Sequence, residues 1–153
     1  MNDFEFHLNN LLVDTFRTIL KVEEKMIQRS DSIALSVSEV HLIEAAYTEG
    51  NSGKTISDIS QTLGITLPSV TISVNKLVKK GFLKKEKNDE DGRSVYISLT
   101  DKGLRINKIH SYFHKKMVDQ LSLEMTDLEK SAMVSGIEKL NSFFKEKSKR
   151  MED

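Results

Sequence analysis

The spacing of apolar side chains predicts six helices and one β-hairpin. Apolar residues recur at three- and four-residue intervals in six segments: 4–29, from 37 to the turn at 50–53, 56–63, 67–80, about 101–121 and 126–145. This period is typical of amphipathic helices. Residues 82–87 and 94–99 instead alternate or are β-branched, and an Asp-Gly turn joins them, so we expect two paired strands there.

Capping residues support these helix starts. Three pairs match the capping box: Ser36 with Glu39, Thr55 with Asp58, and Thr126 with Glu129. Thr66 is a good N-cap for helix 67–80, where Pro68 falls in the first turn and its missing N–H costs little. Gly64 and Gly81 are expected to end the helices before them. The charged residues 145–153 are expected to fray.

This element order predicts a mainly α (α+β) fold, a winged helix-turn-helix with long terminal dimerisation helices. Residues 37–100 form the DNA-binding lobe, in which the hairpin is the wing. Residues 1–36 and 101–153 form the dimerisation helices. Their apolar stripes exceed what the small lobe can cover, so we expect two copies to interlock as a homodimer, with an intramolecular bundle as the alternative.

The charge balance hides a segregation along the chain. The 153 residues carry 23 basic and 23 acidic side chains, which excludes only a protein that is basic throughout. The first 50 residues are acidic and are expected to face away from DNA. Residues 76–87 contain six lysines and one glutamate, and residues 65–85 contain no acid. A helix without negative charge suits an approaching phosphate backbone, although a solvated helix end is the simpler alternative.

The second helix of the pair is expected to present its polar face to the major groove. The candidate contacts, which bond phosphates or base edges or touch a thymine methyl, are Thr66, Ser69, Thr71, Ile72, Ser73, Asn75, Lys76, Lys79 and Lys80. In the wing, Arg93 is expected to enter the minor groove while Asp91 orients its guanidinium. The alternatives are a solvated surface helix and an ordinary hairpin with an exposed arginine.

Residues 77–103, LVKKGFLKKEKNDEDGRSVYISLTDKG, resemble the MarR family of bacterial transcription regulators. The likeness lies in the Asp-rich turn before Gly92-Arg93, the strand after it and the Leu-Thr-x-x-Gly run at 99–103. In element order it covers nearly the whole chain. It implies a homodimer in which each winged lobe reads one half of a palindromic operator on double-stranded DNA.

A narrower resemblance is to the FabT type of MarR protein, carried by residues 21–30, 65–77 and 110–121. It implies repression of fatty-acid (membrane lipid) synthesis genes, with long-chain acyl–acyl carrier protein as corepressor. Such a ligand needs an apolar tunnel and a basic rim. The candidate lining is Phe16, Leu20, Ile109, His110, Phe113, His114 and Met117, and the candidate rim is Arg105, Lys115 and Lys116. The alternative for these apolar residues is that they only form the core of the dimer. The alternative function is a repressor that an aromatic or phenolic ligand releases from DNA.

Other chemistry is not indicated. His110 and His114 have an i,i+4 spacing that suits a metal, but no carboxylate stands at H-E-x-x-H spacing, so we expect no metal site and no cofactor other than the carrier-protein corepressor. The chain has no cysteine, nucleophile elbow or phosphate-binding glycine loop, so we expect no enzyme. Without a signal peptide or a membrane-spanning run, it is expected to be cytoplasmic. A helical interaction protein without a DNA role is a further alternative.

Overall fold

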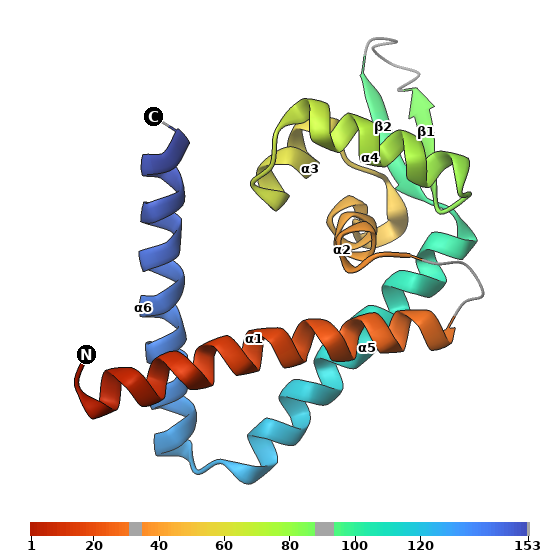
Figure 1. Ribbon diagram of the computed structural model, residues 1–153. Coiled ribbons are helices and arrows are strands. Elements are labelled where there is room, and N and C mark those ends of the chain that lie inside the picture. Colours follow the sequence, from red (N-terminus) through yellow and green to blue (C-terminus); the bar gives the residue numbers. More distant parts are fainter. Residues whose placement is uncertain (31–34, 88–93, 153) are drawn as a thin grey trace. The chain divides into compact units, whose positions relative to one another are not determined.

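The described residues form six α-helices and a two-stranded antiparallel sheet. The computed structural model describes residues 1–30, 35–87 and 94–152, which separate into two compact units, Met1–Ser111 and Tyr112–Asp153. The elements are α1 (Asp3–Ser30), α2 (Val37–Ala46), the 3-10 turn η1 (Glu49–Asn51), α3 (Ile56–Leu63), α4 (Leu67–Lys79), β1 (Leu83–Lys87), β2 (Val95–Leu99), α5 (Asp101–Glu124) and α6 (Asp127–Glu152) (Figure 1). The predicted winged helix-turn-helix fold is confirmed.

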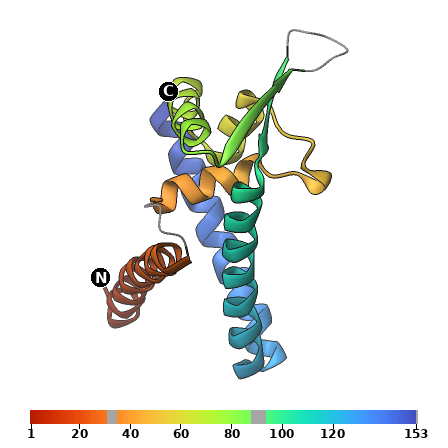
Figure 2. The same ribbon diagram turned by 90° about the vertical axis from the view of Figure 1, so that its right-hand side faces the viewer.

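The wing is a regular hairpin whose base is tied to the rest of the lobe. Strands β1 and β2 run antiparallel, with Leu83 opposite Leu99 (Figure 2). Lys54 exchanges two backbone hydrogen bonds with Ile97, at 3.0 and 2.8 Å, and so adds a short third partner to the sheet. Gly53 has a φ of +85°, and a Cβ there would lie 2.9 Å from the Ile97 carbonyl oxygen. The predicted turn at 50–53 therefore also attaches α2 to the hairpin.

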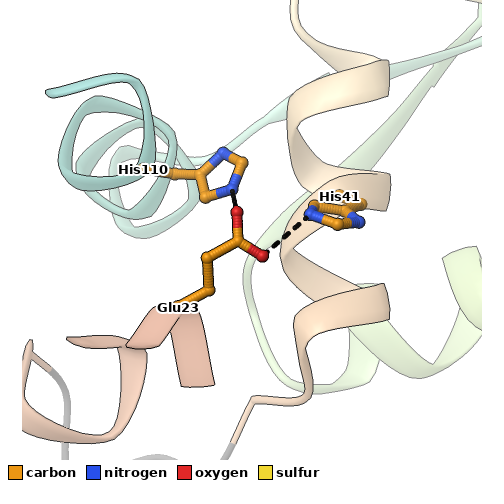
Figure 3. Close-up of side chains that lie close together, drawn as sticks. All are labelled: Glu23, His41 and His110. Carbon is orange, nitrogen blue, oxygen red and sulfur yellow. Dashed lines mark ion pairs between the residues drawn. The ribbon is translucent and has the colours of Figure 1, made fainter. Parts of the chain in front are cut away.

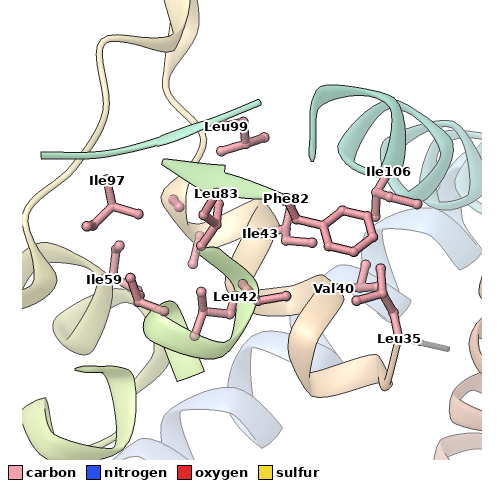
Figure 4. Packing of buried hydrophobic residues seen from close by; sticks show 14 of the residues in the cluster. Leu35, Val40, Leu42, Ile43, Ile59, Phe82, Leu83, Ile97, Leu99 and Ile106 are labelled. Atoms are coloured by element: carbon pink, nitrogen blue, oxygen red, sulfur yellow. The ribbon is translucent and has the colours of Figure 1, made fainter. Parts of the chain in front are cut away.

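One hydrophobic core holds the lobe together. Its fully buried side chains include Ile43 of α2, Ile59 of α3, Phe82 just before β1 and Ile97 of β2 (Figure 4). Leu77 of α4 is also fully buried in this core. Removal of side chains of this size from water contributes about 1.5–3 kcal/mol each. The core therefore fixes α4 and the wing on the same small body.

The helix termini follow the capping predictions, with one exception. Both halves of the capping box are present for α2, α3 and α6. The prediction that residues 145–153 fray is wrong for residues 145–152, because α6 continues to Glu152, while Asp153 lies outside the described residues. Lys149 and Arg150 lie in its last turn, where positive charge favours the helix C-terminus. No helix in the described parts of the chain has an apolar stretch long enough to cross a bilayer.

The start of α5 belongs to the lobe. The Thr100 hydroxyl donates to the Gly81 and Phe82 carbonyl oxygens at 2.7 and 3.1 Å, and Ile106 is buried in the core. The boundary between the compact units therefore follows Ser111 rather than residue 100. The functional division at 36 and 100 stays a prediction.

Gly103 offers a test of this attachment. A Cβ at this position would collide with the Phe82 carbonyl oxygen and lie 3.3 Å from the Leu99 Cβ. We expect Gly103→Ala to lower the free energy of unfolding by about 1–3 kcal/mol, because backbone atoms have to move. Urea unfolding followed by circular dichroism measures the change.

The matched control is Gly136→Ala in α6, where an added Cβ meets nothing within 4 Å. Alanine favours a helix over glycine by about 1 kcal/mol, so this variant is expected to be as stable as the parent or more stable. Equal effects of the two substitutions would contradict the close approach of α5 to Phe82.

Candidate nucleic-acid interface

A tight turn sets the orientation of α4. Helix α3 ends at Gly64, which has left-handed φ and ψ values of 64° and 34° and donates its N–H to the Ser60 carbonyl oxygen at 2.9 Å. Two residues later α4 begins, capped by Thr66. Val70, Val74 and Leu77 are fully buried in the core. Their i, i+4, i+7 spacing turns the opposite face of α4 toward solvent.

The exposed face of α4 carries five of the eleven residues predicted to contact DNA. Ser69, Ile72, Asn75, Lys76 and Lys79 are exposed. Ile72 is 69% exposed, although burial of an isoleucine is normally favourable. An apolar side chain at the centre of this polar face suits contact with a thymine methyl. The remaining candidates on α4, Thr71 and Ser73, are half-buried.

Two hydroxyls of this set also support the start of α4. Thr66 Oγ1 accepts the Ser69 backbone N–H at 3.4 Å and lies 2.9 Å from the Ser69 hydroxyl. Thr71 Oγ1 donates to the Leu67 carbonyl oxygen at 2.8 Å. The bond to Thr66 caps the helix, whereas the bond from Thr71 satisfies its hydroxyl on the helix backbone. The DNA contacts of Thr66 and Thr71 stay predictions.

Glu39 of α2 is the acidic partner of the lysines on α4. Its Oε1 lies 3.0 Å from Lys76 Nζ and 2.8 Å from Lys80 Nζ, and its Oε2 accepts the Ser36 backbone N–H at 2.9 Å. The Lys80 side chain is 25% exposed, whereas that of Lys76 is 62% exposed. Lys80 therefore ties α4 to α2, while Lys76 still extends to the surface.

These contacts keep Glu39 ionised. Burial alone raises the pKa of this carboxyl, but the hydrogen bonds from Lys80, the Ser36 backbone and Lys76 outweigh it and lower the pKa to about 2. Sequence reasoning identified Glu39 only as a capping residue. Its hydrogen bond with Lys80 joins residues 41 positions apart, and no local sequence pattern predicts such a pair.

The first strand of the wing extends the basic surface. Lys85 Nζ donates to Asn75 Oδ1 at 2.7 Å, which leaves the amide N–H groups of Asn75 for other partners. Lys84 pairs with Glu86 Oε1 at 2.7 Å, and Ser98 donates to Glu86 Oε2 at 2.6 Å. These bonds, that from Lys84 first, lower the pKa of the Glu86 carboxyl. The negative charge of Glu86 on β1 is thus compensated by the neighbouring Lys84.

Two groups of predicted site residues stay untested. Asp91 and Arg93 of the wing turn lie outside the described residues. The ligand candidates are divided between the units: Phe16 and Leu20 are exposed on α1, Ile109 is half-buried and His110 is buried in the first unit, whereas Phe113, His114 and Met117 are half-buried in the second. The predicted tunnel stays a prediction.

Comparisons with known proteins agree on one family. The crystal structure of Streptococcus pneumoniae FabT in complex with DNA matches this chain with a TM-score of 0.84 and 31% sequence identity, covering 94% of this chain and 99% of that one. The MarR family model matches residues 35–94, the segment that contains α2, α3, α4 and β1. The chain belongs to the MarR family.

Curated relatives of this MarR-family chain are described as HTH-type transcriptional regulators. It is 34% identical over 87 residues to the HTH-type transcriptional regulator YkoM of Bacillus subtilis, a match covering 57% of this chain and 55% of YkoM. For YfiV of the same organism the identity is 32% over 83 residues, covering 54% and 51%. The chain thus spans about half the length of these curated relatives. The Staphylococcus aureus MepR–DNA complex, 21% identical with a TM-score of 0.66 and covering 85% of this chain and 94% of that one, shares the fold.

The depressed pKa of Glu39 predicts a pH-dependent contribution to stability. A carboxyl whose pKa falls from 4.5 to about 2 on folding stabilises the folded state by roughly 3 kcal/mol above pH 5. This contribution is lost as the pH falls through 4.5 toward 2. We therefore expect Glu39→Gln to lower the free energy of unfolding by about 2–3 kcal/mol at pH 7 and by progressively less toward pH 2.

Urea unfolding at a series of pH values measures this difference. Glu49→Gln, which removes an exposed carboxylate from η1, is the control and is expected to follow the parent at every pH. A constant deficit of Glu39→Gln between pH 7 and pH 3 would show that the deficit comes from the lost cap alone and not from the lysine pairs.

Proposed function

We propose that the protein is a sequence-specific transcriptional repressor that binds a palindromic operator as a homodimer. The observation that carries this proposal is the exposed face of α4, where Ser69, Ile72, Lys76 and Lys79 stand on a winged lobe. This face fits the major groove in shape and in chemistry. The 31% identity to FabT, which was crystallised with DNA, supports the same role.

The electrostatics of the lobe favour DNA on this side. Lys76 and Lys79 on α4 and Lys84 and Lys85 on β1 are exposed. Glu39 is nearly buried and is already bonded to two lysines, so its charge opposes an approaching phosphate less than a solvent-exposed carboxylate would. Basic groups on two neighbouring elements can then contact the backbone on either side of the groove.

The terminal helices supply the surface for a second copy. On α1, large apolar side chains more than half exposed include Phe4, Phe6, Leu11, Phe16 and Leu20; on α6 they include Leu128, Val134, Ile137, Phe143 and Phe144. Exposed apolar surface of this extent on each helix favours an interaction site. A two-fold dimer would cover this apolar surface and place the two copies of α4 about 34 Å apart, which is one turn of DNA.

For the regulated genes and the effector, the resemblance to the FabT type supports fatty-acid synthesis genes and long-chain acyl–acyl carrier protein as corepressor. Apolar candidates such as Met117 suit an acyl chain, since methionine adapts to a flexible ligand. The alternative is a small aromatic or phenolic ligand in the same apolar lining, with the opposite sign of coupling to DNA.

Lys76 tests the role of α4. We expect Lys76→Ala to weaken operator binding by about 1–3 kcal/mol if the ammonium contacts a base. If the ammonium contacts a phosphate, the slope of log K for operator binding against log salt concentration is expected to become shallower by about one. Fluorescence anisotropy at several salt concentrations, with two chains per palindrome at saturation, measures both quantities. Lys108→Ala, an exposed lysine on α5, is the control, and equal losses in the two variants would contradict the assignment.

The effector is tested by titrating the protein onto a fatty-acid synthesis promoter with and without long-chain acyl–acyl carrier protein. Tighter binding in its presence, and not with the unacylated carrier, is the result expected for a corepressor. Release of DNA by salicylate or another phenolic ligand would replace this proposal with the alternative. Absence of any effect of the acylated carrier would contradict the corepressor.

A further inference from the structure

Three titratable side chains from distant parts of the sequence meet inside the first unit. Glu23 near the end of α1, His41 of α2 and His110 of α5 converge on one point (Figure 3). Glu23 Oε2 lies 3.6 Å from His41 Nε2, and Glu23 Oε1 lies 3.5 Å from His110 Nε2. The side chains of Glu23 and His110 are each 3% exposed, whereas that of His41 is 39% exposed. The cluster is thus buried on two sides and reachable from solvent at the third.

The donor atoms are spaced as a metal ion requires. One ligand atom from each of the three residues lies within 4.8 Å of the other two. In a tetrahedral site with bonds of 2.0–2.1 Å, ligand atoms stand about 3.3 Å apart, so the two shorter separations are already close to this value. Two imidazole nitrogens and one carboxylate oxygen suit Zn²⁺ and neighbouring divalent transition metals rather than Ca²⁺ or Mg²⁺.

A second carboxylate stands behind one of the histidines. The other ring nitrogen of His110, Nδ1, lies 3.4 Å from Glu44 Oε2 on α2. In metal sites a ligand histidine usually directs its second nitrogen at a carboxylate, which holds the proton on that nitrogen and leaves the first for the metal. This arrangement is independent of the spacing among the three donors, and it orients His110 Nε2 toward Glu23.

The burial of these groups also calls for a function. A buried carboxylate is costly unless it is paired, and Glu23 lies within 3.6 Å of the imidazoles of His41 and His110. One helical turn before His110, Asn107 is 8% exposed, and its Oδ1 has no hydrogen-bond partner among the described residues. Asn107 and His110 therefore place two buried polar side chains on one face of α5, where apolar side chains would serve for packing alone.

We propose that Glu23, His41 and His110 bind a divalent transition-metal ion of the Zn²⁺ type, with Glu44 positioning His110. Three protein donors leave a fourth position for water or a further ligand. The sequence prediction of no metal site considered His110 with His114, which share α5, and did not include Glu23 and His41. The proposal does not depend on the proposed operator or effector.

The site would connect the long helices with the DNA-binding lobe. His41 lies two residues after Glu39 on the same short helix, and Glu39 holds Lys76 and Lys80 of α4. A metal bond from α1 and α5 to α2 would therefore fix the element on which α4 is anchored. Occupancy of the site is expected to stabilise the first unit, since the ligands are assembled only in the folded state.

The test uses the full chain freed of metal by a chelator and then titrated with Zn²⁺. We expect one ion per chain by calorimetry and a rise in Tm of about 5–10 °C when Zn²⁺ is present at a hundred times Kd. Bound Co²⁺ is expected to give the strong visible absorption of a four- or five-coordinate site. This spectrum is measured on the parent protein, so the result does not depend on whether a variant folds.

Matched variants separate this site from adventitious binding. Glu23→Gln, His41→Gln and His110→Gln are expected to abolish the Tm rise, and Glu44→Gln to weaken binding by about 10–100-fold. Glu24→Gln and His7→Gln, exposed on α1, are the controls and are expected to bind as the parent does. No stoichiometric binding by the parent, or unchanged binding by the three ligand variants, would overturn the proposal and leave a carboxylate–histidine ion pair.

Discussion

The buried carboxylate of Glu39 is the constraint on which the geometry of the DNA-binding lobe depends. It accepts the Ser36 backbone N–H at the start of α2 and the ammonium groups of Lys76 and Lys80 at the end of α4. A charge so nearly buried is tolerated only when its partners stay in place. The hydrophobic core determines how closely α2 and α4 pack, whereas this carboxylate determines the register in which they meet. The position of Lys76 on the surface follows from that register.

Local chemistry is what the sequence allowed us to predict. The capping pairs, the glycine at the end of α3 and the i, i+4, i+7 burial of Val70, Val74 and Leu77 all follow from interactions within one or two helical turns. The strand pairing was also accessible, because a short turn leaves few registers open. The end of α6 was misjudged, since high charge suggested fraying whereas the basic last turn favours the helix.

The candidate site was harder to predict because its contacts are long-range. Asn75 meets Lys85 ten residues later, Glu39 meets Lys80 after 41, and Asn51 bonds the backbone of Leu99 after 48. Nothing in the spacing of these residues marks them as partners. The charge argument was affected in the same way. The acidic N-terminal third was expected to face away from DNA, yet one of its glutamates, Glu39, lies against Lys76 and Lys80 at the end of α4.

Helix α2 is the element through which the two polar clusters of the first unit are joined. In ten residues it carries Glu39, which contacts α4, and both His41 and Glu44, which contact Glu23 and His110. A short helix packed in a dense core moves as a rigid body. A ligand that draws α2 toward α1 at Glu23 would therefore also act on the lysine pairs of α4. Such a ligand is coupled to the proposed operator only to the extent that the operator also binds the two positions of α2 with different affinities.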